Sequence, residues 1–142
     1  RRQRQMGIRD SYVAACRYDH PLARKTHLSW QAYFEQDYIG LDRVSGNRTL
    51  LDRELAHLTP ARPSICETRH VTTMLGMVEA GIGIAAVPAM SMPAGEHSVL
   101  RAVPLTDPVV TRTVGLIRLS GRIQSYVAAE LEKLIIEQYP SG

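Results

Sequence analysis

The alternation of short apolar segments and helical patterns in this chain predicts an α/β fold, in which helices cover both faces of one sheet. Three observations lead to this prediction. Apolar runs of strand length alternate with segments whose apolar residues recur at helical spacing. Hydrophobic residues make up 44% of the 142-residue sequence and charged residues 22%, a balance typical of one globular domain. Proline and glycine fall between the patterned segments, where turns are needed.

Each expected element has a local reason in the sequence. Ser29 is a residue type that caps helices, and Trp30, Tyr33 and Phe34 follow it on one helical face. Proline ends the second helical pattern, because its ring cannot continue a helix. In order, we expect a strand at 11–17, a helix at 29–36, a strand at 38–42, a helix at 48–58, a strand at 64–68, a helix at 71–80, strands at 82–87, 99–105 and 109–119, and a closing helix at 124–138.

The stretch from 63 to 88 carries the most information. It has the pattern of a strand, a polar turn, a helix, a glycine turn and a second strand that ends at a proline. Thr72 and Thr73 stand near the helix start, where side-chain oxygens can accept hydrogen bonds from free backbone N–H groups. Gly81 stands where a left-handed residue is expected to end the helix. The polar turn therefore lies where a strand leads into a helix, which is where open α/β folds bind ligands.

The same stretch contains a dinucleotide-binding sequence pattern, but its context does not favour nucleotide binding. Residues 81–86 match G-x-G-x-x-G/A, but that pattern binds a pyrophosphate only when a strand precedes it and a helix follows. Here a helix precedes, and Pro88 stops any helix that would follow. These glycines are expected to end a helix and to begin a strand.

The positive charge of the chain is concentrated at its N-terminus. Arg1, Arg2 and Arg4 account for the net charge of +3, since the remaining 14 Lys and Arg residues balance 14 Asp and Glu residues. DNA-binding domains need a basic stripe that neutralises phosphates, and residues 11–142 show none. We therefore expect residues 1–10 to be a linker or hinge and the chain to bind no nucleic acid by itself.

The sequence lacks the signals of an enzyme, a metal site, a cofactor site or a membrane protein. Cys16 and Cys66 lie in apolar surroundings without metal-ligand spacing, which fits free thiols in a reducing, cytoplasmic setting. Ser45 lies outside a nucleophile-elbow motif, so we expect it to cap a helix. No apolar run approaches the length of a membrane span, and no secretory signal is present.

Polar residues gather at two turns, each of which follows a predicted strand and opens a helix. If the two strands are parallel neighbours, both helix N-termini point to the same end of the sheet, where they would attract an anion. Arg69 could add a forked contact to a carboxylate. We therefore expect a small carboxylated or polar ligand here, although two capped helices that merely face water would give the same pattern. The candidate ligand-binding residues are Ser45, Gly46, Asn47, Arg69, His70, Val71 and Thr72.

Three stretches of the chain resemble the effector-binding domain of LysR-type transcriptional regulators. They are CRYDHPLA at 16–23, YIGLDRVSGNRTLLD at 38–52 and ETRHVTTMLGMVEAGIGIAAVP at 67–88. The third is the most specific, because the family repeats a polar strand end, a short helix and a V-x-A-G-x-G-I/V-x-x-x-P run. The closing strand and helix also look like those of the family, so that the resemblance covers most of residues 11–138.

The resemblance implies an α-β-α sandwich of the type II periplasmic-binding kind, with two lobes that hold a small molecule between them. By this comparison, residues 11–97 are the second regulatory lobe, and residues 98–142 return to the first lobe. The start of the first lobe and the DNA-binding winged helix-turn-helix would be absent. In the family, the cleft face of the second lobe includes the residues after its second and third strands, which are the same two turns.

The implied function is to sense a small-molecule effector and thereby to modulate DNA binding by the absent domain. Promoter DNA would be a partner only through that domain, and the full-length parent would be a homo-dimer or homo-tetramer in the cytoplasm. The alternative is a solute-binding protein of a transporter, which shares the fold but needs export. An enzyme on the same lobes is disfavoured, because no catalytic constellation is present.

Overall fold

The computed structural model describes residues 2–95 and 98–139, although the side chains of residues 2–6 lie outside the described part. The chain divides into two compact units, which are described separately. The main unit comprises Ser11–Val110, and the terminal unit comprises Arg1–Asp10 together with Thr111–Gly142.

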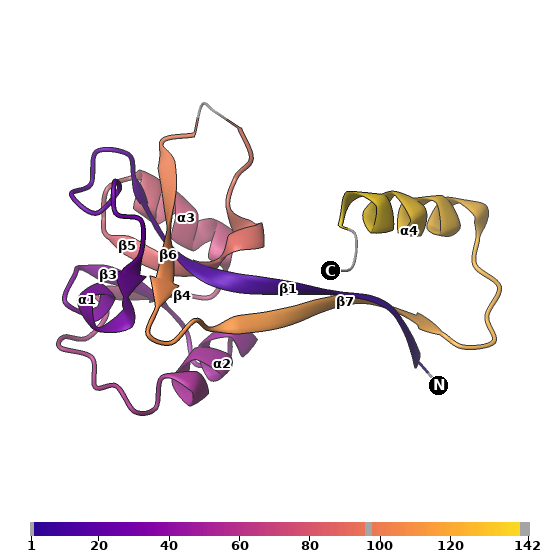
Figure 1. The fold of residues 1–142 in the computed structure, drawn as a ribbon, viewed down its shortest axis with the longest axis horizontal. Coiled ribbons are helices and arrows are strands. Elements are labelled where there is room, and N and C mark those ends of the chain that lie inside the picture. The colour runs from indigo at the N-terminus through magenta and orange to yellow at the C-terminus, as the bar shows by residue number, and fades with distance from the viewer. Residues whose placement is uncertain (1, 96–97, 140–142) are drawn as a thin grey trace. The chain divides into compact units, whose positions relative to one another are not determined.

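The strands form one mixed sheet with the order β2-β6-β1-β5-β3-β4, and β7 pairs with β1 (Figure 1). β3 runs parallel to both β4 and β5, whereas β1 runs antiparallel to β5 and β6. The strands are β1 (Arg2–Arg17), β2 (Leu28–Ser29), β3 (Tyr38–Leu41), β4 (Cys66–Thr68), β5 (Ile84–Pro88), β6 (Leu100–Thr106) and β7 (Thr111–Leu119). The helices are α1 (Trp30–Phe34), α2 (Gly46–Glu54), α3 (Val71–Glu79), the 3-10 helix η1 (Ala89–Ser91) and α4 (Tyr126–Gln138).

The main unit has a core on each face of its sheet. Successive residues of β1 point to opposite faces, so that Tyr12, Ala14 and Cys16 enter one core and Val13 and Ala15 enter the other. The first core contains the aromatic residues of α1 and the leucines of α2, and the second contains the apolar face of α3. Helices therefore cover both faces, which confirms the α-β-α sandwich expected from the sequence.

The expected helices and strands after residue 10 are all present, with ends that differ by a few residues. Ser29 caps α1, because its hydroxyl accepts a hydrogen bond from the backbone N–H of Ala32 at 3.1 Å. Gly81 has a φ of 81°, the left-handed conformation that ends α3. The helix expected at 48–58 begins two residues earlier and ends at Glu54, so that only the first part of that leucine stripe is helical.

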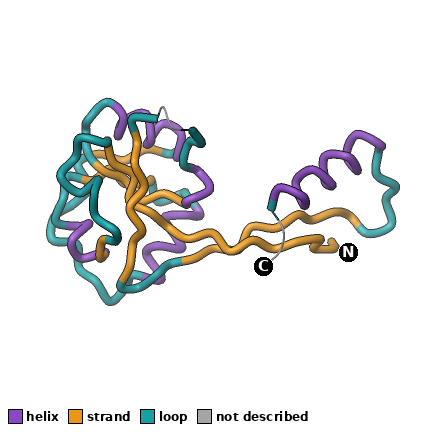
Figure 2. The backbone as a smooth tube through the Cα atoms, turned by 45° about the horizontal axis from the view of Figure 1, so that its top comes forward, coloured by secondary structure: helices purple, strands orange, loops and turns teal. Residues whose placement is uncertain are grey.

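Residues 2–10 differ from the expected linker, because they form the first part of the 16-residue strand β1. Their polar sequence gives no strand pattern of its own, and the strand forms through its pairing with β7, seen as two orange strands side by side in Figure 2. The structure also divides the chain after Val110, whereas the sequence suggested a division after residue 97.

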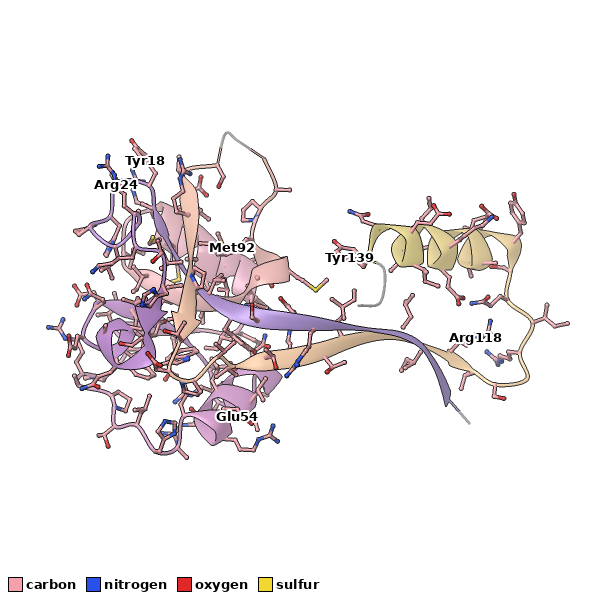
Figure 3. All side chains as sticks on the ribbon, in the orientation of Figure 1. Tyr18, Arg24, Glu54, Met92, Arg118 and Tyr139 are labelled. Carbon is pink, nitrogen blue, oxygen red and sulfur yellow. The ribbon has the colours of Figure 1, made fainter. Side chains whose placement is uncertain are left out.

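The terminal unit combines β7 and α4 with the first residues of β1. Asp10 is buried there, and its carboxylate pairs with Arg112 at 3.0 Å. None of the residues of α4 is buried, and Tyr139, labelled after this helix in Figure 3, is 38% exposed. Among the described residues, no helix is long and apolar enough to cross a membrane.

Candidate functional site

The two polar turns lie next to each other at one end of the sheet. Leu41, the last residue of β3, is opposite Thr68, the last residue of the parallel strand β4. The backbone N–H of Asp42 donates to the carbonyl oxygen of Thr68 at 3.0 Å, which extends the pairing into the turns. Both strands lead directly into a helix beyond this point. The two strands are therefore parallel neighbours, and the N-termini of the helices that follow them lie at the same end of the sheet. The sequence hypothesis depended on this arrangement.

The first turn carries Ser45, Gly46 and Asn47 at the start of α2. Ser45 occupies the N-cap position but makes no side-chain cap hydrogen bond, so the expected capping role of its hydroxyl is wrong. Gly46 opens the helix, and a Cβ atom added there would meet nothing within 4 Å. Asn47 is anchored from β1, because the Tyr12 hydroxyl donates to its Oδ1 at 2.7 Å. The turn is thus held in place by β1, which is separated from β3 in the sheet by β5.

The second turn carries Arg69, His70, Val71 and Thr72 at the start of α3. His70 is the N-cap residue, and no side-chain hydrogen bond caps this helix, so the capping expected from the threonines is absent. Val71 packs against the core beneath α3, whereas His70 and Thr72 are exposed. Arg69 remains 67% exposed, and its Nε lies 3.2 Å from Oδ2 of Asp42. This ion pair joins the second turn to the first.

An ion-pair network beside the turns was not expected from the sequence. The Arg48 guanidinium donates from Nη1 to the carbonyl oxygen of Leu41 at 2.7 Å and from Nε to Asp52 at 2.9 Å. Its Nη1 also lies 3.3 Å from Oε1 of Glu67 on β4. One arginine of α2 is therefore bound to β3 and β4. Only the i, i+4 spacing of Arg48 and Asp52 is visible in the sequence, because the contact with Glu67 depends on the strand pairing.

A cavity of about 590 Å³ lies near these turns, within the main unit. The aromatic side chains of α1 and β3 line it from one side, and α2 and the segment from 56 to 64 line it from the other. None of the seven candidate residues lines this cavity, although Arg48 and Glu67 do. The seven candidate residues therefore lie outside the wall of this cavity.

The described residues offer no metal site and no evident nucleophile. No group of three or more His, Cys, Asp or Glu side chains lies close enough to hold a metal ion in residues 2–95 and 98–139. Burial raises the pKa of the Cys16 thiol, which lowers its thiolate fraction and hence its reactivity. The chemistry available at the turns is thus hydrogen bonding and charge pairing with a bound molecule.

Comparison with known families identifies one match over nearly the whole chain. The model of the LysR substrate binding domain matches residues 2–140. The chain is 40% identical over 129 residues to YbhD, an uncharacterised HTH-type transcriptional regulator of Escherichia coli K12. It is 33% identical over 131 residues to YfeR, an uncharacterised HTH-type regulator of Shigella flexneri. These matches cover 91% and 92% of the chain but only 41% and 42% of the two relatives, so the chain spans about two fifths of their length.

Solved structures share the fold at lower sequence identity. The effector-binding domain of QuiR in complex with shikimate matches 97% of the chain and 65% of that domain, with a TM-score of 0.69 and 20% identity. The regulatory domain of CcmR from Synechocystis PCC6803, in complex with 2-PG, has a TM-score of 0.72 and 18% identity. The match covers 99% of this chain and 67% of the CcmR chain.

Proposed function

Because the chain belongs to the family of LysR substrate-binding domains, we propose that it senses a small-molecule effector for a bacterial transcriptional regulator and catalyses no reaction. The curated relatives support a regulatory role, since YbhD and YfeR are both named as HTH-type transcriptional regulators. The same names count against the alternative of a solute-binding protein for a transporter. Two structures of the same fold were solved with small molecules, shikimate and 2-PG, which supports a small ligand.

We place the effector at the two turns, at Ser45, Gly46 and Asn47 and at Arg69, His70, Val71 and Thr72. The observation that supports this most is the parallel pairing of β3 with β4, which puts the N-termini of α2 and α3 at one end of the sheet. Free backbone N–H groups and the helix dipoles favour negative charge at this end. Arg69 is exposed and could exchange Asp42 for a ligand carboxylate. A small carboxylated or polar molecule fits these groups best.

In the full-length regulator we place the DNA-binding winged helix-turn-helix outside this chain. The second regulatory lobe would comprise residues 11–97 together with the following strand, β6, and would thus correspond to the main unit. The residues after this unit, up to 142, would return to the first lobe. The exposed apolar residues of the terminal unit support this division, because they would be covered by the rest of that lobe. The regulator would assemble as a homo-dimer or homo-tetramer in the cytoplasm, where its promoter DNA is found.

A thermal-shift screen of the 142-residue chain tests the proposed function. A ligand that binds only the folded state raises the melting temperature in proportion to its binding free energy. We expect at least one small carboxylate from a panel of central metabolites, shikimate among them, to raise the melting temperature in a saturable way. A folded chain that no carboxylate or polar metabolite stabilises would contradict the proposal.

A further inference from the structure

We propose that the cavity beneath α2 is a second small-molecule site, separate from the two turns, for a compact, uncharged molecule with an aromatic ring. Its volume of about 590 Å³ is within the range of cavities that hold small organic ligands, roughly 300–1,000 Å³. All of its lining residues belong to the main unit, so the site needs no other part of the chain.

One wall of the cavity is a cluster of aromatic rings. Trp30, Tyr33 and Phe34 of α1 and Tyr38 of β3 line it, and their neighbouring ring centroids lie 5.3–6.0 Å apart. Trp30 and Tyr33 are held by hydrogen bonds at their polar ends: Trp30 Nε1 donates to the carbonyl oxygen of Pro108 at 2.9 Å, and the Tyr33 hydroxyl accepts from the N–H of Ala86 at 2.8 Å. Trp30 and Tyr33 are almost fully buried and hold this wall in place. The ring surface open to a ligand therefore comes mainly from Phe34, against which an aromatic ligand can pack edge to face or offset.

The opposite wall is aliphatic and belongs to a helix that leaves room beneath it. Leu51 and Leu55 of the α2 region line the cavity, and Leu58, Pro60 and Pro63 continue the lining along the following segment. No residue within α2 itself is buried, so this helix covers the sheet without filling the space below. Burial of an apolar ligand against this wall would remove apolar surface from water, which is favourable at about 25 cal/mol per Å².

The charged side chains around the cavity are already paired with one another, which favours an uncharged ligand. Arg48 is paired with Asp52 and Glu67, and Arg62 is paired with Asp37 at 2.7 Å. An anionic ligand would have to displace one of these carboxylates, and a cation would have to displace an arginine. The Tyr38 hydroxyl donates to the carbonyl oxygen of Arg62, and burial raises the pKa of Tyr38, so this group also remains neutral. The cavity therefore differs in ligand class from the turns, which favour a carboxylate.

The fluorescence of Trp30 offers a direct test, because it is the single tryptophan of the sequence and lines the cavity while being only 1% exposed. Bromobenzene is a suitable probe, since it is compact, uncharged and aromatic, and its bromine quenches a tryptophan that lies close by. Trp30 lies directly behind Phe34, with the two ring centroids 6.0 Å apart. We expect saturable quenching by bromobenzene and almost none by iodide, which is charged and would have to leave water to reach the ring. Quenching by bromobenzene that rises linearly without saturation would overturn the proposal.

Paired variants of α2 locate the bound probe. Leu51→Glu puts a carboxylate against the apolar ligand and should weaken bromobenzene binding at least tenfold. Thr49→Glu adds the same charge to an exposed residue outside the cavity lining and should leave binding within twofold. If Leu51→Glu unfolds the chain, Ala56→Glu provides the comparison, because Ala56 lines the cavity but is exposed. Equal affinities in the folded cavity variant and in Thr49→Glu would contradict a site beneath α2.

Discussion

At the scale of single residues, three serines occupy helix N-cap positions, but only two of them make the hydrogen bond that stabilises the helix start. The hydroxyls of Ser29 and Ser125 accept hydrogen bonds from backbone N–H groups three residues ahead, at 3.1 and 3.2 Å. Ser45 occupies the same position in α2 without such a bond. All three serines satisfy the sequence preference for the N-cap, so the sequence alone could not distinguish them.

Alanine substitutions should reproduce this difference in the free energy of unfolding. Ser29→Ala removes an acceptor from the start of α1 and is expected to cost about 1 kcal/mol. Ser45→Ala removes no cap hydrogen bond and is expected to cost less than about 0.5 kcal/mol, the usual range for a surface substitution. Urea denaturation of both variants measures the two losses. Equal losses would show that the Ser45 hydroxyl caps α2 after all.

At the scale of elements, α3 shows how local sequence signals fix a helix at both ends. Its buried face consists of Met74, Leu75 and Val78, at the spacing that predicted it. Gly81 ends it in the left-handed conformation, and a Cβ atom added there would lie 3.7 Å from Cδ of Arg17, an ordinary contact. The requirement for glycine at this position is therefore conformational and not steric.

Two glycine substitutions should change the stability of α3 in opposite directions. Gly81→Ala forces an L-residue into the left-handed region and is expected to lower the free energy of unfolding by about 1–2 kcal/mol. Gly76→Ala lies within the helix with nothing within 4 Å of the added Cβ, and should raise that free energy by roughly 0.5–1 kcal/mol. Thermal or urea denaturation gives both values. Unchanged or increased stability in Gly81→Ala would contradict the assignment of Gly81 as a helix end, and a loss in Gly76→Ala would contradict the expected gain within the helix.

Most elements could be predicted from the sequence because their signals are local. Apolar periodicity, prolines and glycines located the strands and helices after residue 10 to within a few residues. The strand at 2–10 and the two-residue strand β2 could not be predicted, because neither has an apolar strand pattern of its own and both form through pairing with strands far along the chain. The turns of the candidate site were located for the same local reasons, whereas the contacts that join them, Asp42 with Arg69 and Arg48 with Glu67, depend on the strand pairing.

At the scale of the whole molecule, the terminal unit exposes more apolar surface than a domain normally leaves to water. Among its described residues, side chains exposed by more than half include Ile123, Tyr126, Val127, Leu131 and Leu134. In the main unit, by contrast, most of the large apolar side chains lie in two buried cores, and fewer of them, such as Val44 and Val109, are exposed. Apolar surface of this kind tends to associate with other apolar surface, which in solution another copy of the chain would supply.

The 142-residue chain should therefore self-associate as its concentration rises, which sedimentation velocity can follow. Leu131→Lys places a charge within the apolar face of α4 and should shift the chain toward the monomer. Ala129→Lys adds the same charge at another exposed position of the helix and should have a smaller effect. A chain that stays monomeric at every concentration, or an equal response to both substitutions, would show that this face does not drive association.

The central claim is that the two turns bind the effector, and calorimetric titration of one pair of threonine variants tests it most directly. The titrant is the carboxylate that most raises the melting temperature of the chain. Thr72→Val keeps the shape of the side chain but removes the hydroxyl at the start of α3, which should weaken binding by about 1–3 kcal/mol, or roughly five- to 150-fold. Thr73→Val makes the same change at the next exposed residue and should leave the affinity within about twofold. Unchanged affinity in both Thr72→Val and Ser45→Ala would contradict the account and move the effector away from these turns.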